Sequence, residues 1–165
     1  MTEIISDKLV VGPWVAKRNL GAFAPETSEA IGLKRGNELV AGVVYEAWNG
    51  ASMVVHVAVE GLMTPAYLAA IYHYPFVHVG VGKLIAPIGE DNAKSINFVS
   101  KMGFRLESRI PDAHPDGALL LYTMSRAECK YIKERYSGKV ILADIPGSAN
   151  AQRWQRQKLL STGSA

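Results

Sequence analysis

The sequence has few residues that could form covalent cross-links or bind metals. Its 165 residues include one cysteine, Cys129, so no disulfide bond can form within the chain. Cys129 lies in a segment with a helical pattern, where we expect a packed or partly covered thiol rather than a nucleophile. The four histidines lack the spacing of metal ligands. We therefore expect neither a disulfide scaffold nor a metal site.

Long apolar runs are also missing. No stretch approaches the roughly 20 apolar residues that a membrane-spanning helix needs. The first residues, MTEIISDKLVV, lack the basic start and the small-residue cleavage site of a signal peptide. The sequence therefore predicts a cytoplasmic protein with no membrane contact.

Charge is low overall and unevenly distributed. The formal net charge is +3, with a balance of −2 over residues 1–125 and +5 over residues 126–165. A broad basic face with interleaved aromatic residues, typical of nucleic-acid enzymes, is absent, so we do not expect a nucleic-acid partner. We expect one domain over residues 1–145 and a basic tail over 146–165, with a short helix within 149–160. The tail either contacts an acidic partner or is simply a solvated end.

Hydrophobic periodicity and turn residues predict an α+β domain with a mixed sheet. The predicted strands are 8–15, 30–35, 38–48, 52–59, 83–88, a strand from 104, 118–124 and a short one at 140–142. The predicted helices are 65–76, 92–102 and 125–136, with a short helical turn around 25–29. Residues 110–117 read as a loop, and Asn49-Gly50 reads as a type I′ hairpin turn.

The most informative segment runs from Asn92 to Phe104. Asn92 suits the N-cap of a helix, and Ile96, Val99 and Met102 give that helix an apolar face. Gly103 then provides the left-handed residue that ends a helix. A strand, a capped helix, a Gly-Phe ending and a second strand therefore follow one another.

This unit closely resembles the C-terminal half of the GCN5-related N-acetyltransferase (GNAT) superfamily. The family pattern is an Asn, a small residue three positions on, and a Lys-x-Gly-Phe ending, here Asn92, Ser95 and 101–104. With Ser95 at the small-residue position, the pattern most resembles the branch of the family that acetylates protein N-termini, including those of ribosomal proteins. Residues 74–76, Tyr-Pro-Phe, and 115–117, Pro-Asp-Gly, resemble members encoded by phages and prophages. The resemblance covers about residues 8–129.

The resemblance implies the GNAT acyl-CoA N-acyltransferase fold, a mixed and mostly antiparallel sheet flanked by helices. In that fold strands four and five splay apart, and the pantetheine arm of acetyl-CoA fits between them. It implies that the backbone of Val57, Ala58 and Val59 contacts this arm, with Asn92 and Ser95 beside it. The family usually has two helices between its first two strands. Only about fourteen residues are left for them here, so we predict that this region is shortened.

The resemblance also locates the loop for the cofactor's pyrophosphate, where glycines and free backbone N–H groups hold the anion. The implied cofactor-binding residues in this loop are Gly61, Leu62, Met63 and Thr64. The family motif is eroded, because Met63 replaces a glycine and Ala58 replaces a basic or amide residue. The negative charge of Glu60 is a further departure at this position.

The implied catalytic residues are Ser95, His56 and Glu60. Many family members protonate the leaving thiolate with a Tyr at the position of Val99, so Ser95 is the remaining candidate donor here. A thiolate needs little help, because the reference pKa of a thiol is about 8.5. The acceptor amine needs a base, which His56 or Glu60 could supply. A packed structural role for His56 is the alternative.

These residues predict an acetyl-CoA-dependent N-acetyltransferase that moves an acetyl group directly to an amine. The acceptor is a protein N-terminus, a Lys or a small amine. Two alternatives remain open. One is a binding or regulatory protein that keeps the fold with weak or no activity, and the other is a phage- or virion-associated interaction protein that uses its basic tail. Three arrangements remain open for Trp154, Leu159 and Leu160: they dock on a second subunit in a homodimer, they pack on their own domain, or they lie in a disordered segment.

Overall fold

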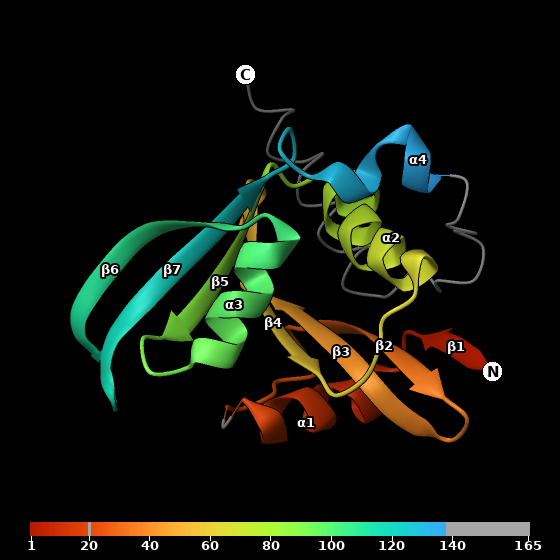
Figure 1. Ribbon diagram of the computed structural model, residues 1–165, viewed down its shortest axis with the longest axis horizontal. Coiled ribbons are helices and arrows are strands. Elements are labelled where there is room, and N and C mark those ends of the chain that lie inside the picture. Colours follow the sequence, from red (N-terminus) through yellow and green to blue (C-terminus); the bar gives the residue numbers. More distant parts are fainter. Residues whose placement is uncertain (20, 138–165) are drawn as a thin grey trace.

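Seven strands form one mixed sheet in the order β1-β2-β3-β4-β5-β7-β6, which confirms the predicted α+β fold (Figure 1). The computed structural model describes residues 1–19 and 21–137. The strands are β1 (Thr2–Ile5), β2 (Glu29–Arg35), β3 (Glu38–Glu46), β4 (Ser52–Val59), β5 (Lys83–Gly89), β6 (Arg105–His114) and β7 (Gly117–Ser125). The helices are α1 (Lys8–Arg18), α2 (Pro65–His73), the π-helix η1 (Tyr74–Val79), α3 (Ala93–Met102), the 3-10 helix η2 (Lys130–Ile132) and α4 (Glu134–Ser137).

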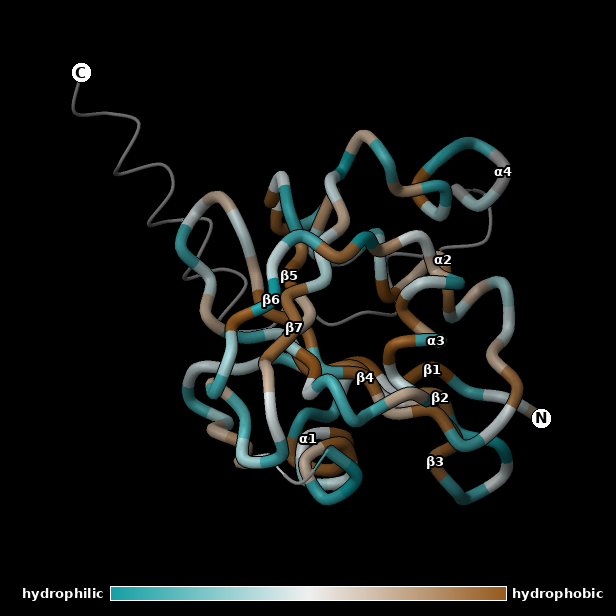
Figure 2. Tube along the Cα trace, turned by 60° about the vertical axis from the view of Figure 1, so that its left-hand side comes forward, coloured by the Kyte–Doolittle hydropathy of each residue, from teal (hydrophilic) through white to brown (hydrophobic). Residues whose placement is uncertain are grey.

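Helices cover both faces of the sheet. Helix α1 packs on β2, β3 and β4, and α2 lies across the same strands on the other side (Figure 1). Gly42 lets α1 approach closely, because a Cβ there would lie 2.6 Å from Val15 Cγ2. The larger core lies on the α2 side, and Figure 2 shows hydrophobic residues concentrated along the strands. The sheet therefore separates a small α1-side core from a large α2-side core.

Strands β4 and β5 separate along their length, as the fold class requires. They pair in parallel only where Ser52–Val54 faces Lys83–Ile85. Beyond Val54, β4 stays paired with β3 as far as Val59, while β5 turns toward β7 and pairs with it over its whole length. The far half of β4 therefore keeps an open edge that faces β5.

The prediction of a first strand at 8–15 is wrong, because these residues form helix α1. Asp7 caps the helix by accepting the Leu9 N–H at 3.0 Å, and Val11 and Val15 bury one side of it. The first strand is instead Thr2–Ile5. One helix therefore lies between the first two strands, where the family usually has two. The predicted short helical segment at 25–29 is reduced to a turn at residues 25–27, where the Thr27 N–H donates to the Ala24 carbonyl at 3.2 Å, and Glu29 already begins β2.

The predicted type I′ turn at Asn49-Gly50 is wrong as well. Positive φ occurs at Ala47 and Gly50, and Asn49 instead accepts the N–H groups of Ala51 and Ser52 through its side chain, each at 2.9 Å. This is a side-chain-closed turn of the kind that Asn favours. It joins β3 to β4 without the backbone geometry that a two-residue hairpin needs.

Two C-terminal predictions differ from the structure. Residues 110–114 are part of β6, which continues to His114 through an irregular register with Asp112 at φ 57°. The predicted helix 125–136 is not continuous. Residues 126–128 form a turn, Cys129 is extended, and η2 and α4 follow it. Tyr131 stacks on Tyr72 with ring centroids 4.8 Å apart, so burial of this ring outweighs local helix periodicity.

Helix α2 begins as predicted, with the Thr64 hydroxyl accepting the Tyr67 N–H at 3.1 Å. Pro75 does not stop the chain from coiling, because η1 continues from Tyr74 to Val79. The predicted strand at 140–142, the tail 146–165 and the dimer residues Trp154, Leu159 and Leu160 lie outside the described residues. Within residues 1–19 and 21–137, no helix has the length and hydropathy to cross a bilayer.

Candidate active site

A cleft of about 210 Å³ opens where β4 and β5 separate. Six residues that the sequence assigned to the site meet there. They are Val57, Ala58, Val59, Glu60, Asn92 and Ser95. Four residues that the sequence did not indicate complete the lining, namely Arg18, Asn19, Lys94 and Phe98. Five further residues that the sequence assigned to the site do not line the cleft. They are His56, Gly61, Leu62, Met63 and Thr64.

The open edge of β4 supplies the backbone groups of the cleft. The Glu60 N–H donates to the Val40 carbonyl on β3 at 2.8 Å. Because backbone groups alternate along an antiparallel ladder, those of Val57 and Val59 then point away from β3. The Asn19 side-chain amide accordingly donates to the Val57 carbonyl at 3.3 Å. This edge can therefore pair with an extended ligand that carries amide groups.

The N-terminus of α3 forms the opposite wall. The Asn92 side-chain oxygen accepts the Ser95 N–H at 3.1 Å, and both residues line the cleft. Asn92 is therefore a helix cap and a cleft residue at once. At the other end Gly103, with φ 106°, closes the helix, and Val99 is buried in the core. The position of the family's Tyr thus carries an apolar core residue.

The loop after β4 offers part of an anion site. The N–H of Gly61 shares the Val40 carbonyl with Glu60, at 3.1 Å, so it is engaged within the sheet. Within the described residues, the backbone N–H groups of Leu62, Met63 and Thr64 donate to no other residue. They lie at the N-terminus of α2, where the helix dipole favours an anion. The guanidinium of Arg35, which the sequence did not indicate, donates to the Leu62 carbonyl at 3.1 Å and brings a positive charge to this loop.

Arg18 neutralises Glu60 at the mouth of the cleft. Its Nε lies 2.8 Å from Glu60 Oε1 and its terminal nitrogen lies 2.9 Å from Glu60 Oε2, so the ion pair is bidentate. The guanidinium also lies 3.6 Å from the centre of the Trp14 ring. The hydrogen bond from Arg18 lowers the pKa of Glu60 below its usual value. Glu60 therefore stays ionised at neutral pH and paired with a cation.

His56 lies on the α1 face of β4, the same face as Ala58 and Glu60. Its Nε2 lies 2.7 Å from Glu46 Oε1 on the neighbouring strand, and both side chains are about one-third exposed. A carboxylate at one ring nitrogen orients an imidazole and fixes its tautomer. Glu46 therefore holds His56 in an orientation that suits a general base. His56 lies two residues before Ala58, which lines the cleft.

Two of the unpredicted residues had a sequence signal. Lys94 and Phe98 lie within two turns of Asn92 and Ser95 on the same predicted helix, so helical spacing places them near the cleft. Arg18 and Asn19 had none. They follow a segment that reads as a strand, and Asn19 reaches a partner 38 residues away.

Asp91, His114 and Asp116 form a group whose ligand atoms lie within 4.8 Å of one another. The Nδ1 atom of His114 accepts the Asp116 N–H at 3.2 Å, which uses the lone pair that a metal would take. The group therefore closes the β6–β7 turn, and we assign no metal to it.

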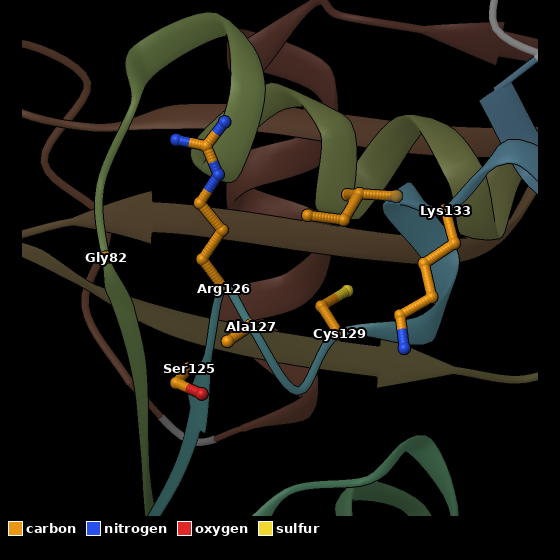
Figure 3. A pocket seen from close by; sticks show the side chains of 7 residues that line it. Gly82, Ser125, Arg126, Ala127, Cys129 and Lys133 are labelled. Atoms are coloured by element: carbon orange, nitrogen blue, oxygen red, sulfur yellow. The ribbon is translucent and has the colours of Figure 1, made fainter.

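A second hollow of about 620 Å³ lies at the end of β7, lined by Gly82, Ser125, Arg126, Ala127, Cys129, Ile132 and Lys133. In Figure 3, Arg126 and Lys133 stand on opposite sides of Cys129, and the guanidinium of Arg126 points away from the thiol. Cys129 is fully buried, and burial raises the pKa of its thiol. It is a packed thiol, as the sequence predicts, and among the described residues that line this pocket there is no carboxylate or imidazole to act as its base.

Comparison with known proteins gives a likeness of structure rather than of sequence. No protein-family profile and no curated protein sequence matches the chain. A spermidine N-acetyltransferase SpeG mutant from Vibrio cholerae matches with a TM-score of 0.63 at 10% identity, over 81% of this chain and 98% of that one. The same enzyme in complex with CoA and spermine gives 0.56 at 11% identity, over 73% and 76%.

A GNAT-family acetyltransferase from Desulfovibrio desulfuricans, described as putative, matches with a TM-score of 0.56 at 15% identity, over 76% of this chain and 99% of that one. At such low identities the likeness to these solved structures establishes the fold alone. The chain therefore has the fold of the GNAT acetyltransferases.

Proposed function

We propose that this protein is an acetyl-CoA-dependent N-acetyltransferase. One observation carries the proposal: the open edge of β4 and the capped N-terminus of α3 face each other across a single cleft. An extended arm with amide groups can pair with the Val57 and Val59 backbone, while Asn92 and Ser95 contact it from the other wall. The fold of the structural neighbours supports the same use of this cleft.

The phosphates of acetyl-CoA would bind the loop after β4. The backbone N–H groups of Leu62, Met63 and Thr64 and the guanidinium of Arg35 are the groups that favour an anion there. Gly61 would serve by its small size, since a Cβ would lie 3.0 Å from Val40 Cβ. Lys94 adds a cation at the cleft itself.

The reaction proposed is a direct transfer. His56, oriented by Glu46, accepts a proton from the acceptor ammonium through water. The neutral amine attacks the thioester carbonyl carbon, a C–N bond forms, and the C–S bond breaks. The CoA thiolate leaves with the electron pair, and Ser95 donates a hydrogen bond to it. The nitrogen of the new amide gives up its second proton, which passes through water to the thiolate and makes the CoA thiol. Glu60 is the weaker candidate base, because Arg18 lowers its pKa and occupies both carboxylate oxygens.

The acceptor in this proposal is an amine: a protein N-terminus, a Lys or a small amine. One structural neighbour is a spermidine N-acetyltransferase in complex with CoA and spermine, so polyamines are the first small acceptors to assay. From the sequence we further propose that the protein belongs to the N-terminal acetyltransferase branch and is encoded by a phage or prophage. We also propose that it is cytoplasmic and forms a homodimer.

The test is release of free thiol from acetyl-CoA in the presence of an amine panel, with peptides, Lys and spermidine as separate arms. We expect amine-dependent thiol release with at least one arm. A second function, cofactor binding without transfer, is favoured by Val99, a buried apolar residue at the position where many members of the resembled family carry a Tyr acid. Calorimetric binding of acetyl-CoA without thiol release in any arm would identify this second function.

A further inference from the structure

We infer that Arg18 and Asn19 form a clasp that closes the cleft before ligand binding and must open when acetyl-CoA enters. The inference rests on the proposed function, because it concerns the same cleft. Its subject is a pair of residues at the end of α1 that reach across to β4. Two independent contacts make the clasp: Arg18 to Glu60, and Asn19 to the Val57 carbonyl.

Asn19 occupies a strand edge that a ligand would use. Its amide nitrogen donates to the Val57 carbonyl at 3.3 Å, on the side of β4 that β5 has left open. An extended ligand with N–H groups needs that same carbonyl as an acceptor. The carbonyl oxygen has two lone pairs, but the Asn19 side chain lies at the open edge where an added ligand strand would lie, so it competes with the ligand for this acceptor.

Arg18 holds the clasp in place from the neighbouring position. Its guanidinium is fixed by both oxygens of Glu60 and lies 3.6 Å from the centre of the Trp14 ring. The backbone is fixed as well, because the Asn19 N–H donates to the Val15 carbonyl at 3.0 Å. Opening therefore requires rotation of two side chains rather than movement of α1. This matches the small volume of the cleft in the closed form.

If the clasp closes the cleft, removal of the contact between Asn19 and Val57 should strengthen the binding of acetyl-CoA. Asn19→Ala removes the competing donor and leaves the Val57 carbonyl free, so we expect acetyl-CoA to bind about two- to tenfold more tightly, the range that one neutral hydrogen bond gives. Adenosine 3′,5′-bisphosphate lacks the pantetheine arm, so its affinity should be unchanged by the same substitution. Asn97→Ala, at an exposed position on α3, is the matched control and should change neither affinity.

The experiment is isothermal titration of the wild-type protein and the two variants with both probes, after melting curves confirm folding. Tighter acetyl-CoA binding in Asn19→Ala alone supports the clasp. Equal or weaker acetyl-CoA binding in Asn19→Ala, with binding retained in the wild type, overturns the clasp and leaves the proposed function standing. Absence of acetyl-CoA binding in all three proteins overturns both.

Discussion

At the residue scale, the site depends on side chains that each have a structural partner. Asn92 caps α3, Glu60 pairs with Arg18, and His56 pairs with Glu46. These partners orient the groups, and they also change which group suits which role. An ion-paired Glu60 with a lowered pKa is a poor base at neutral pH, whereas an imidazole oriented by a carboxylate is a good one.

His56→Gln tests the proposed base. We expect kcat to fall by about 10²-fold or more, because general-base assistance is lost. Affinity for acetyl-CoA should stay the same, since His56 does not line the cleft. His114→Gln is the control and should keep the wild-type kcat; an unchanged kcat in His56→Gln would place the base elsewhere.

At the element scale, α3 and α1 show what the sequence could and could not predict. The bounds of α3 follow from local signals: the Asn92 cap, an apolar stripe and Gly103. Helix α1 was predicted as a strand because its apolar residues do not keep to one face. Leu9 and Val10 are exposed while Val11 and Val15 are buried, and Pro13 lies inside the helix. Because this apolar pattern is weak, it does not distinguish a helix from a strand. Packing against the sheet favours the helix.

Two substitutions at Asn92 separate its cap from its cleft role. Asn92→Ala should cost about 1 kcal/mol of unfolding free energy and also weaken acetyl-CoA binding, because cap and contact are both lost. Asn92→Asp should keep the unfolding free energy within about 0.5 kcal/mol, since Asp caps as well as Asn, yet still weaken binding. Urea unfolding and calorimetry measure the two effects.

Ser100→Ala, on the exposed side of the same helix, serves as the control for these variants. It should leave acetyl-CoA binding unchanged. Wild-type affinity in Asn92→Asp would mean that Asn92 is a helix cap only.

At the scale of the whole molecule, the splayed sheet connects the two faces. His56 lies on the α1 face, while Asn92 and Ser95 belong to the α3 side. In the proposed reaction the cofactor and the acceptor therefore meet at the gap between β4 and β5. Local signals predicted most strands, and the resemblance to the GNAT superfamily led to six residues that line the cleft. It could not predict the contacts of Arg18 and Asn19, which form only when α1 packs on the sheet.

Global stability should depend on pH through His73, at the junction of α2 and η1. Burial lowers the pKa of His73, with His78 adding to the effect, and its buried Nδ1 has no hydrogen-bond partner among the described residues. The folded state therefore binds fewer protons than the unfolded chain. The stabilisation is present above the unfolded pKa of about 6.5 and is lost as pH falls through the lower folded pKa.

Urea midpoints at about pH 7.5 and pH 5.5 measure this dependence. The wild-type midpoint should fall at the lower pH, and His73→Gln should reduce that fall. His114→Gln should keep the full wild-type difference. An equal fall in wild type and His73→Gln would assign the pH dependence to other groups.

The most direct test of the central claim is a calorimetric titration of the wild-type protein with acetyl-CoA. The proposed use of the β4–α3 cleft predicts saturable binding at one site, with a dissociation constant at or below about 1 mM, the upper range for enzyme substrates. No binding heat at millimolar acetyl-CoA, in a protein shown to be folded, would contradict the account.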